Sequence, residues 1–269
     1  MIVLQGINKS YRTPAGRQYL FRDLNLVIPE GRNLGVIGRN GAGKSTLLRI
    51  IGGIDRPDHG KVIAGNKKIS WPVGFRGVMQ KIMSGRENAK LICRLYVPKE
   101  KLSEKIAFIR SFSELGPYFD MPVDTYSKGM RARLAFALSM AFDFDCYVID
   151  EVMAVGDAGF RDKCFAIMAQ KRKHADFILA SRNMKKIRQY CNLVLFLGRH
   201  ETRLYEEVGA AIKAYRKEEE RERNAEAADR ASKENNTQDE TALDADGDAR
   251  ESASGRGGKD RMTDLTTER

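Results

Sequence analysis

The sequence predicts an α/β fold in which helices cover a buried, mainly parallel β-sheet, and two observations support this. Short apolar runs such as residues 146–150 and 176–181 end in small or acidic residues, and helix-like segments alternate with them. Runs of this kind are typical of strands that are buried on both faces of a sheet. The glycine-rich segment 38–46 follows one of these runs and opens a helical pattern. The expected folded domain covers residues 1–215.

Six strands and four helical regions are expected along this domain. The strands are residues 1–7, 24–28, 33–38, 146–150, 176–181 and 193–198. The helical regions are residues 44–52, a stretch from Glu87 to about Arg110, residues 127–142 and residues 161–174. No apolar stretch reaches the roughly 18 residues of a membrane-spanning helix. The first residues also lack the basic-then-apolar pattern of a secretory signal.

Charge is distributed unevenly along the 269 residues. The whole chain has 47 Lys and Arg against 36 Asp and Glu, a formal net charge of +11. Residues 216–269 hold 11 basic and 16 acidic residues, whereas residues 1–215 hold 36 basic and 20 acidic residues. The acidic segment is nearly free of large apolar side chains, so we expect it to be disordered, as a solvated tail or a tether for a partner. The basic domain suggests an anionic partner.

The four cysteines are far apart in the sequence and form no C-x-x-C pair. This spacing argues against a zinc site or a disulfide framework and fits a reducing compartment.

Residues 38–46 match the phosphate-binding pattern G-x-x-x-x-G-K-[ST] between an expected strand and an expected helix. The glycines allow main-chain amides to approach an anion, and the start of the helix favours negative charge. We expect Lys44 to reach the β- and γ-phosphates of a nucleotide and the Ser45 hydroxyl to bind Mg²⁺. The predicted nucleotide contacts in this segment are Gly38, Asn40, Gly41, Ala42, Gly43, Lys44, Ser45 and Thr46.

The expected strand 146–150 ends in two acids, Asp150 and Glu151. An apolar strand that ends in acids is weak evidence alone, but together with the phosphate loop it indicates an NTPase. We assign Asp150 to the Mg²⁺ shell and Glu151 to the general base that orients the attacking water.

Residues 126–134, Tyr-Ser-Lys-Gly-Met-Arg-Ala-Arg-Leu, resemble the signature motif of ATP-binding cassette (ABC) ATPases in the variant carried by polysaccharide exporters. The resemblance implies a P-loop NTPase with a RecA-like core and a helical subdomain at about residues 83–140. It also implies a head-to-tail homodimer in which Ser127 and Gly129 contact the ATP of the partner subunit. The alternative for Ser127 is a simple helix N-cap.

Three further positions match the ABC pattern. Tyr11 corresponds to the aromatic residue that stacks on adenine, although it also fits an ordinary strand aromatic. Gln80 corresponds to the glutamine that contacts Mg²⁺ and water and leads to the helical subdomain. Residues 155–157, Val-Gly-Asp, resemble the loop that crosses the dimer interface, with Asp157 as the contact. Asp157 also fits a helix N-cap, and both roles can coexist.

Residues 70–74, 84–88 and 188–191 resemble the capsular-polysaccharide export ATPases of Gram-negative bacteria. This resemblance implies export of a capsular or related cell-surface polysaccharide, ATP and Mg²⁺ as cofactors, and a peripheral location on the cytoplasmic face of the inner membrane. The implied partners are an integral-membrane permease subunit, reached through a groove around residues 81–100, and the polysaccharide export machinery. No direct contact with nucleic acid is expected. The basic surface then faces anionic lipid or handles an acidic glycan.

One position departs from the resemblance. Similar ATPases have a histidine that touches the γ-phosphate after the serine that follows the strand 177–180, but here Arg182 follows Ser181. Arginine can donate hydrogen bonds to the γ-phosphate but stays charged at neutral pH. Arg182 therefore acts as a charge clamp with slowed hydrolysis, which we favour, or the site binds ATP with little turnover.

Two alternative functions remain open from the sequence. The first is a soluble, non-transport ABC ATPase that acts on nucleic acid or ribosomes, which the net charge permits. The second is a hydrolysis-impaired regulatory cassette, for which Arg182 is the support.

Overall fold

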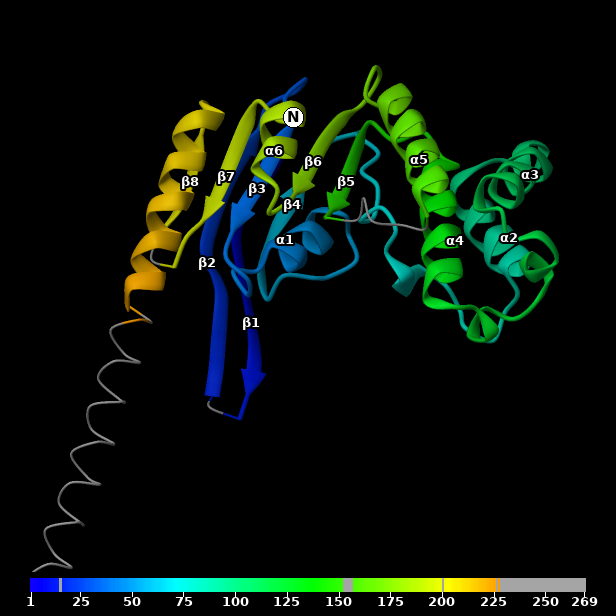
Figure 1. Ribbon diagram of the computed structural model, residues 1–269, viewed down its shortest axis with the longest axis horizontal. Coiled ribbons are helices and arrows are strands. Elements are labelled where there is room, and N and C mark those ends of the chain that lie inside the picture. Colours follow the sequence, from blue (N-terminus) through cyan, green and yellow to red (C-terminus); the bar gives the residue numbers. More distant parts are fainter. Residues whose placement is uncertain (15, 152–156, 200, 226, 228–269) are drawn as a thin grey trace, which may run out of the picture. The chain divides into compact units, whose positions relative to one another are not determined.

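The computed structural model describes residues 1–14, 16–151, 157–199, 201–225 and 227. The chain divides into a unit of Met1–Arg216 and a unit of Lys217–Arg269. In the second unit, residues 217–225 are helical. The first unit contains every strand of the described residues and the predicted site (Figure 1).

Among the described residues, five strands form a sheet in the order β5-β6-β3-β7-β8. The strands β3 (Leu34–Gly38), β5 (Cys146–Asp150), β6 (Asp176–Ala180) and β7 (Leu193–Leu197) are parallel. The edge strand β8 (Thr202–Tyr205) pairs antiparallel with β7. The mainly parallel α/β sheet predicted from the sequence is thus confirmed.

Two predicted strands lie in a second sheet, which the sequence did not reveal. Strands β1 (Ile2–Thr13), β2 (Gly16–Ile28) and β4 (His59–Ile63) form an antiparallel sheet in the order β2-β1-β4. β1 and β2 form a long hairpin that extends below the rest of the unit in Figure 1. Near Ile2 of β1 and Ile28 of β2, buried residues alternate with more exposed ones, which is typical of antiparallel strands with one solvated face.

The helices of the first unit include α1 (Lys44–Ile51), α2 (Gly85–Tyr96), α3 (Leu102–Ser113), α4 (Lys128–Met140), α5 (Ala158–Lys171) and α6 (Met184–Tyr190). Residues 208–216 are also helical. The single helical stretch expected from Glu87 to Arg110 is wrong in detail, because α2 and α3 are separate helices. Val97 is extended before Pro98, as the ring of a following proline requires, and the first helix ends there. Figure 1 shows α2, α3 and α4 gathered on the side away from β8.

Two hydrophobic clusters occupy the two faces of the parallel sheet. On one face, side chains such as Tyr147, Phe177 and Phe196 pack with residues of α2–α5. On the other face, Val148 and Ile178 pack with α1 and the antiparallel sheet. Successive residues of each parallel strand point to opposite faces, so these strands are apolar apart from Asp150 at the end of β5 and Asp176 at the start of β6. Consequently α1 is enclosed between the two sheets.

Within the described residues, no helix combines the length and the apolar character that crossing a membrane requires.

Candidate functional site

The loop between β3 and α1 has the backbone of a phosphate cradle. Gly38, Gly41 and Gly43 all have positive φ values, of 156°, 80° and 91°. At Gly38, an added Cβ would lie 2.5 Å from the carbonyl oxygen of Leu197, and at Gly43 it would lie 2.7 Å from Cζ of Phe21. These two positions therefore require glycine for space as well as for conformation.

The first turn of α1 is open to an anion. Gly43 is the N-cap residue and has no side chain to accept from the first amides, and no acidic residue lies in the first turn. These uncapped amides and the positive end of the helix dipole suit a phosphate. An added Cβ on Gly41 would meet no atom within 4 Å, so the loop also leaves room at this point.

Lys44 closes the loop on itself. Its Nζ donates to the carbonyl oxygens of Gly38 and Arg39, both at 2.7 Å. Burial lowers the pKa of Lys44; the charge of Glu151 opposes this shift, that of Arg182 adds to it, and that of Asp150 opposes it.

Sheet topology explains why these groups meet. The parallel strands β5, β6 and β3 are neighbours, so their carboxyl ends share one edge of the sheet. Asp150 ends β5 and pairs with Ala180, and the Glu151 amide donates to the Ala180 carbonyl oxygen at 3.0 Å. Arg182 follows two residues after Ala180 and is exposed. Residues from three strands thus border the phosphate loop.

Glu151 adopts a left-handed backbone conformation, with φ of 46°. A non-glycine residue pays roughly 1 kcal/mol for this region, so such residues are uncommon outside turns and functional sites.

Tyr11 lies beside the phosphate-loop helix. Its hydroxyl is 3.4 Å from Oγ1 of Thr46, while its ring remains 41% exposed. The ammonium group of Lys9 lies 5.5 Å from the ring centroid. An exposed aromatic face one helical turn from the loop is available for stacking on a planar base.

The segment that leads to Gln80 runs beside β5. Residues 69–73 run beside this strand, with the Val73 amide donating to Val148 O at 2.8 Å. After the 3₁₀ turn Arg76–Val78, the main chain of Gln80 is bound by the side chain of Asn88, and the residue itself is exposed.

The signature segment lies in a different part of the unit. Ser127 is the N-cap of α4, and its Oγ accepts the Met130 amide at 3.2 Å. α4 packs on α2 and α3, whereas α1 packs on β3, β5 and β6. Figure 1 shows α1 and α4 well separated. Within one chain, therefore, Ser127 and Gly129 do not join the phosphate loop.

Asp157 uses both carboxylate oxygens within its own chain. Oδ1 accepts the Phe160 amide at 3.0 Å as the N-cap of α5, and Oδ2 accepts from Arg133 at 2.5 Å. The Phe160 hydrogen bond, helped by the charge of Arg133, lowers the pKa of Asp157. The remainder of the predicted crossing loop, Val155 and Gly156, lies outside the described residues.

Two residues of this region were not assigned a role from the sequence. Asn88 is completely buried within α2, and Arg133 joins Asp157 to Glu114. A buried Asn in a helix interior is a signal, because Asn is a poor helix former unless its amide is hydrogen-bonded. For Arg133 the sequence offers no comparable signal.

The oxygen groups near the phosphate loop fit Mg²⁺ bound together with a nucleotide. Ser45 lies in the first turn of α1, and Asp150 and Glu151 end β5. Mg²⁺ prefers one or two carboxylates plus phosphate oxygens and water over an all-protein cage. In the described part of the chain, no three His, Cys, Asp or Glu side chains cluster as a metal site.

A cavity of about 860 Å³ lies elsewhere, lined by residues such as Glu30, Lys67, Asp145 and Arg172. It includes none of the predicted nucleotide contacts, and Lys67 there is already paired with Glu30 and Asp176.

A family model described as "ABC transporter" matches residues 21–154. The chain is 52% identical over 217 residues to the polysialic acid transport ATP-binding protein KpsT of Escherichia coli, covering 80% of this chain and 96% of that protein. It is 42% identical to the capsule polysaccharide export ATP-binding protein CtrD of Neisseria meningitidis, covering 80% and 98%. A dimeric structure of the ATP-binding cassette MJ0796 bound to ADP and Pi has a similar fold, with a TM-score of 0.61 at 20% identity, covering 76% of this chain and 98% of that one.

Proposed function

The chain belongs to the ABC transporter family of ATP-binding proteins, and on this premise we propose that it is the ATP-hydrolysing subunit of a capsular or related cell-surface polysaccharide exporter. One observation carries the proposal: the loop between β3 and α1 has glycines at positive φ, an uncapped helix start and Lys44 folded over its carbonyl oxygens. The relatives, with identity over about 80% of the chain, are transport and export ATP-binding proteins. These names favour an exporter over a nucleic-acid enzyme.

ATP binding follows from the loop and from Tyr11. The uncapped amides at the start of α1 and the ammonium group of Lys44 bind the phosphates. In the structure Lys44 holds the carbonyl oxygens of Gly38 and Arg39, so the same side chain orders the loop and presents charge to the ligand. The exposed ring of Tyr11 stacks on the adenine.

Hydrolysis uses groups at the ends of β5 and β6. Mg²⁺, when bound, supplies charge neutralisation at the phosphate oxygens. Ser45, Asp150 and Gln80 are the residues that would hold it, through a hydroxyl, a carboxylate and an amide oxygen. Glu151 orients the attacking water and accepts its proton, and Arg182 donates to the γ-phosphate in place of the usual histidine.

Because the signature segment lies away from the phosphate loop of its own chain, a complete site needs a second copy. Ser127 and Gly129 are both exposed, and an added Cβ on Gly129 would meet only Oγ of Ser127, at 3.8 Å. Packing within the chain therefore does not explain a glycine here. We assign Ser127 and Gly129 to contacts with the γ-phosphate bound by the partner, and Asp157 to the same dimer interface.

The coupling to a membrane partner is assigned to α2 and the segment before it. Ile82 and Leu95 are 84% and 75% exposed, and Leu91 and Leu95 are one turn apart on the same helix face. We assign these three exposed side chains to one apolar docking face, with Ile82 two residues after Gln80 in the sequence. We propose that a segment of the permease covers it, which places the chain peripherally on the cytoplasmic face of the inner membrane.

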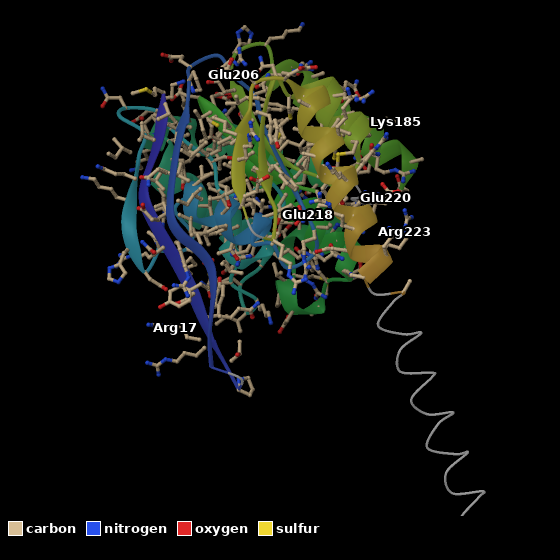
Figure 2. The ribbon with its side chains drawn as sticks, turned by 90° about the vertical axis from the view of Figure 1, so that its left-hand side faces the viewer. Arg17, Lys185, Glu206, Glu218, Glu220 and Arg223 are labelled. Atoms are coloured by element: carbon tan, nitrogen blue, oxygen red, sulfur yellow. The ribbon has the colours of Figure 1, made fainter. Side chains whose placement is uncertain are left out.

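The remaining basic charge lies at several exposed places. Arg12 and Arg17 lie opposite each other in the β1–β2 hairpin near its tip, and Lys185 lies on α6 (Figure 2). Such dispersed charge favours general attraction to anionic lipid over a specific glycan site.

The ATPase rate of the purified chain tests the proposal. Wild type should hydrolyse ATP in the presence of Mg²⁺, and Lys44→Ala and Glu151→Gln should each lower kcat by roughly 10²–10³-fold. Glu151→Gln should retain ATP binding, whereas Lys44→Ala should lose it. A wild-type rate no higher than that of Lys44→Ala would exclude hydrolysis and favour a regulatory cassette that only binds ATP.

A further inference from the structure

Asn88 is a completely buried polar side chain that makes four hydrogen bonds. Its Oδ1 accepts the Gln80 amide at 2.7 Å. Its Nδ2 donates to the carbonyl oxygens of Gln80, Met83 and Ser84 at 3.0, 3.2 and 2.9 Å. A buried amide without partners would be costly, so this environment is specific for an Asn side chain.

The bonds to Gln80 hold both main-chain polar groups of that residue. Its amide donates to Asn88 and its carbonyl accepts from Asn88, so the peptide geometry around Gln80 is fixed relative to α2. The side chain of Gln80 is exposed and is not engaged by this arrangement. Asn88 therefore sets the position and direction from which the Gln80 side chain starts.

The same segment is joined to the chain that leads into the signature motif. The Asp124 amide donates to Lys81 O at 2.9 Å, and the Val123 amide donates to Met83 O at 3.0 Å. Ser84 and Pro122 also form an antiparallel bridge. Residues 122–124 are followed by Thr125, by buried Tyr126 and then by Ser127.

We propose that Asn88 is a positioning residue that holds Gln80, and through residues 81–84 the approach to Ser127, to helix α2. A displacement of α2 by a partner on its apolar face is then transmitted to both segments together. Asn88 does not touch the nucleotide in this scheme and acts only through Gln80. The inference rests on the proposed function, because the role of Gln80 at the metal and the water comes from there.

Amide hydrogen exchange of the free chain tests the positioning directly. In Asn88→Ala, the amide of Gln80 loses its acceptor, so a peptide covering residues 79–84 should exchange faster than in wild type. Residues 90–96 of the same helix should keep their protection. Asn88→Asp keeps an acceptor for the Gln80 amide, so that amide should be better protected than in Asn88→Ala. Unchanged exchange at residues 79–84 in Asn88→Ala would overturn the proposal.

Steady-state kinetics supply the second measurement. Asn88→Ala should lower kcat by about 10–100-fold while KM for ATP changes less than about twofold, because only the group near the reacting atoms is misplaced. The matched control is Ser84→Ala, which removes the capping box of α2 but leaves the Asn88–Gln80 bonds. It should keep kcat near wild type. Equal kcat in the Asn88→Ala and Ser84→Ala chains would contradict the positioning role.

Gln80→Ala separates this inference from the function it rests on. If Gln80→Ala leaves kcat unchanged, the proposed role of Gln80 is wrong, whatever the exchange data show. If Gln80→Ala lowers kcat but Asn88→Ala alters neither exchange nor kcat, the positioning inference alone is wrong. Asn88→Leu separates the loss of hydrogen bonds from the loss of volume, because leucine fills the buried site without polar atoms. It should reproduce the Asn88→Ala kinetics.

Discussion

Arg133 donates a hydrogen bond to Asp157 Oδ2 at 2.5 Å and another to Glu114 Oε2 at 2.9 Å. Lys163 of α5 also pairs with Glu114, at 3.0 Å. The alternating charges thus connect the end of α3, the helix after the signature segment, and the start of α5. The guanidinium carbon of Arg133 also lies 4.5 Å from the ring centroid of Phe160. A movement of α4 would therefore displace Asp157, the residue predicted to make the contact across the dimer interface.

The two roles of Asp157 can be separated by substitution. Asp157→Ala removes both the cap of α5 and the ion pair, and should lower Tm by roughly 2–4 °C. Asp157→Asn keeps a cap acceptor for the Phe160 amide but loses the charge, so its Tm should lie close to wild type because an exposed ion pair contributes little. Thermal unfolding by circular dichroism measures both. An equal loss of Tm in the two variants would contradict a stabilising role for the N-cap hydrogen bond of Asp157.

The pH dependence of this site has a definite sign. The pKa of Asp157 is lowered in the folded chain, so the unfolded chain binds a proton at higher pH than the folded one. The stability that Asp157 contributes is present above its unfolded pKa and is lost as pH falls through the folded pKa. The Tm difference between wild type and Asp157→Ala should therefore shrink as the pH is lowered from 7 toward 3.

Arg182→His should raise the ATPase rate by about tenfold. Imidazole can exchange a proton near neutral pH, whereas the guanidinium group remains charged. Arg182→Ala should fall below wild type, because the γ-phosphate loses a donor. Single-turnover hydrolysis by the three purified chains decides the order. A His variant slower than wild type would show that the charge of Arg182 is itself required.

The apolar docking face of Ile82, Leu91 and Leu95 can be tested without disturbing the ATP site. Leu95→Ser should reduce co-purification with the co-expressed membrane subunit by about tenfold, since a large apolar contact is lost. The ATPase rate of the isolated chain should be unchanged. Val27→Ser, at an exposed apolar position of β2, is the control. Equal recovery of the Leu95→Ser and Val27→Ser complexes would place the permease elsewhere.

We expect the folded chain to lose stability at alkaline pH because its four cysteines are buried. Burial raises the pKa of Cys93 to about 11 and the pKa values of Cys146, Cys164 and Cys191 to about 12. Between pH 9 and these values the unfolded chain releases thiol protons that the folded chain keeps, so unfolding becomes more favourable as pH rises. A thiol reagent at pH 8 should find all four unreactive until the chain is denatured. Rapid labelling of native protein would contradict their burial.

The sequence identified the parts of the site whose chemistry demands particular residues. Gly38, Gly43 and Lys44 stand out because a phosphate loop tolerates few substitutions, and the carboxylates after β5 follow from strand patterning. The α/β fold and the ABC resemblance were confirmed. Their individual roles at the site remain predictions.

The remaining features depend on tertiary contacts that no local pattern encodes. Strand β4 is short and mostly exposed, and α6 is a polar helix of seven residues, so neither has a strong hydrophobic period. The pairing of β1 with β2 over a long hairpin includes register shifts that alternation alone cannot place. The contacts of Asn88 with Gln80 and of Arg133 with Asp157 form only in the folded chain, so the sequence alone does not reveal them.

The enclosure of α1 between the two sheets has a consequence for substrate selection. Tyr11 belongs to the antiparallel sheet and Gly43 begins α1, and Phe21 of β2 contacts that glycine position. Residues of β1, β2 and α1 pack in one hydrophobic cluster, so the distance between Tyr11 and the phosphate loop is fixed. On the roles proposed for Tyr11 and Lys44, ATP would span this distance from its base to its γ-phosphate, and a ligand shorter than a triphosphate would leave the γ-phosphate position empty.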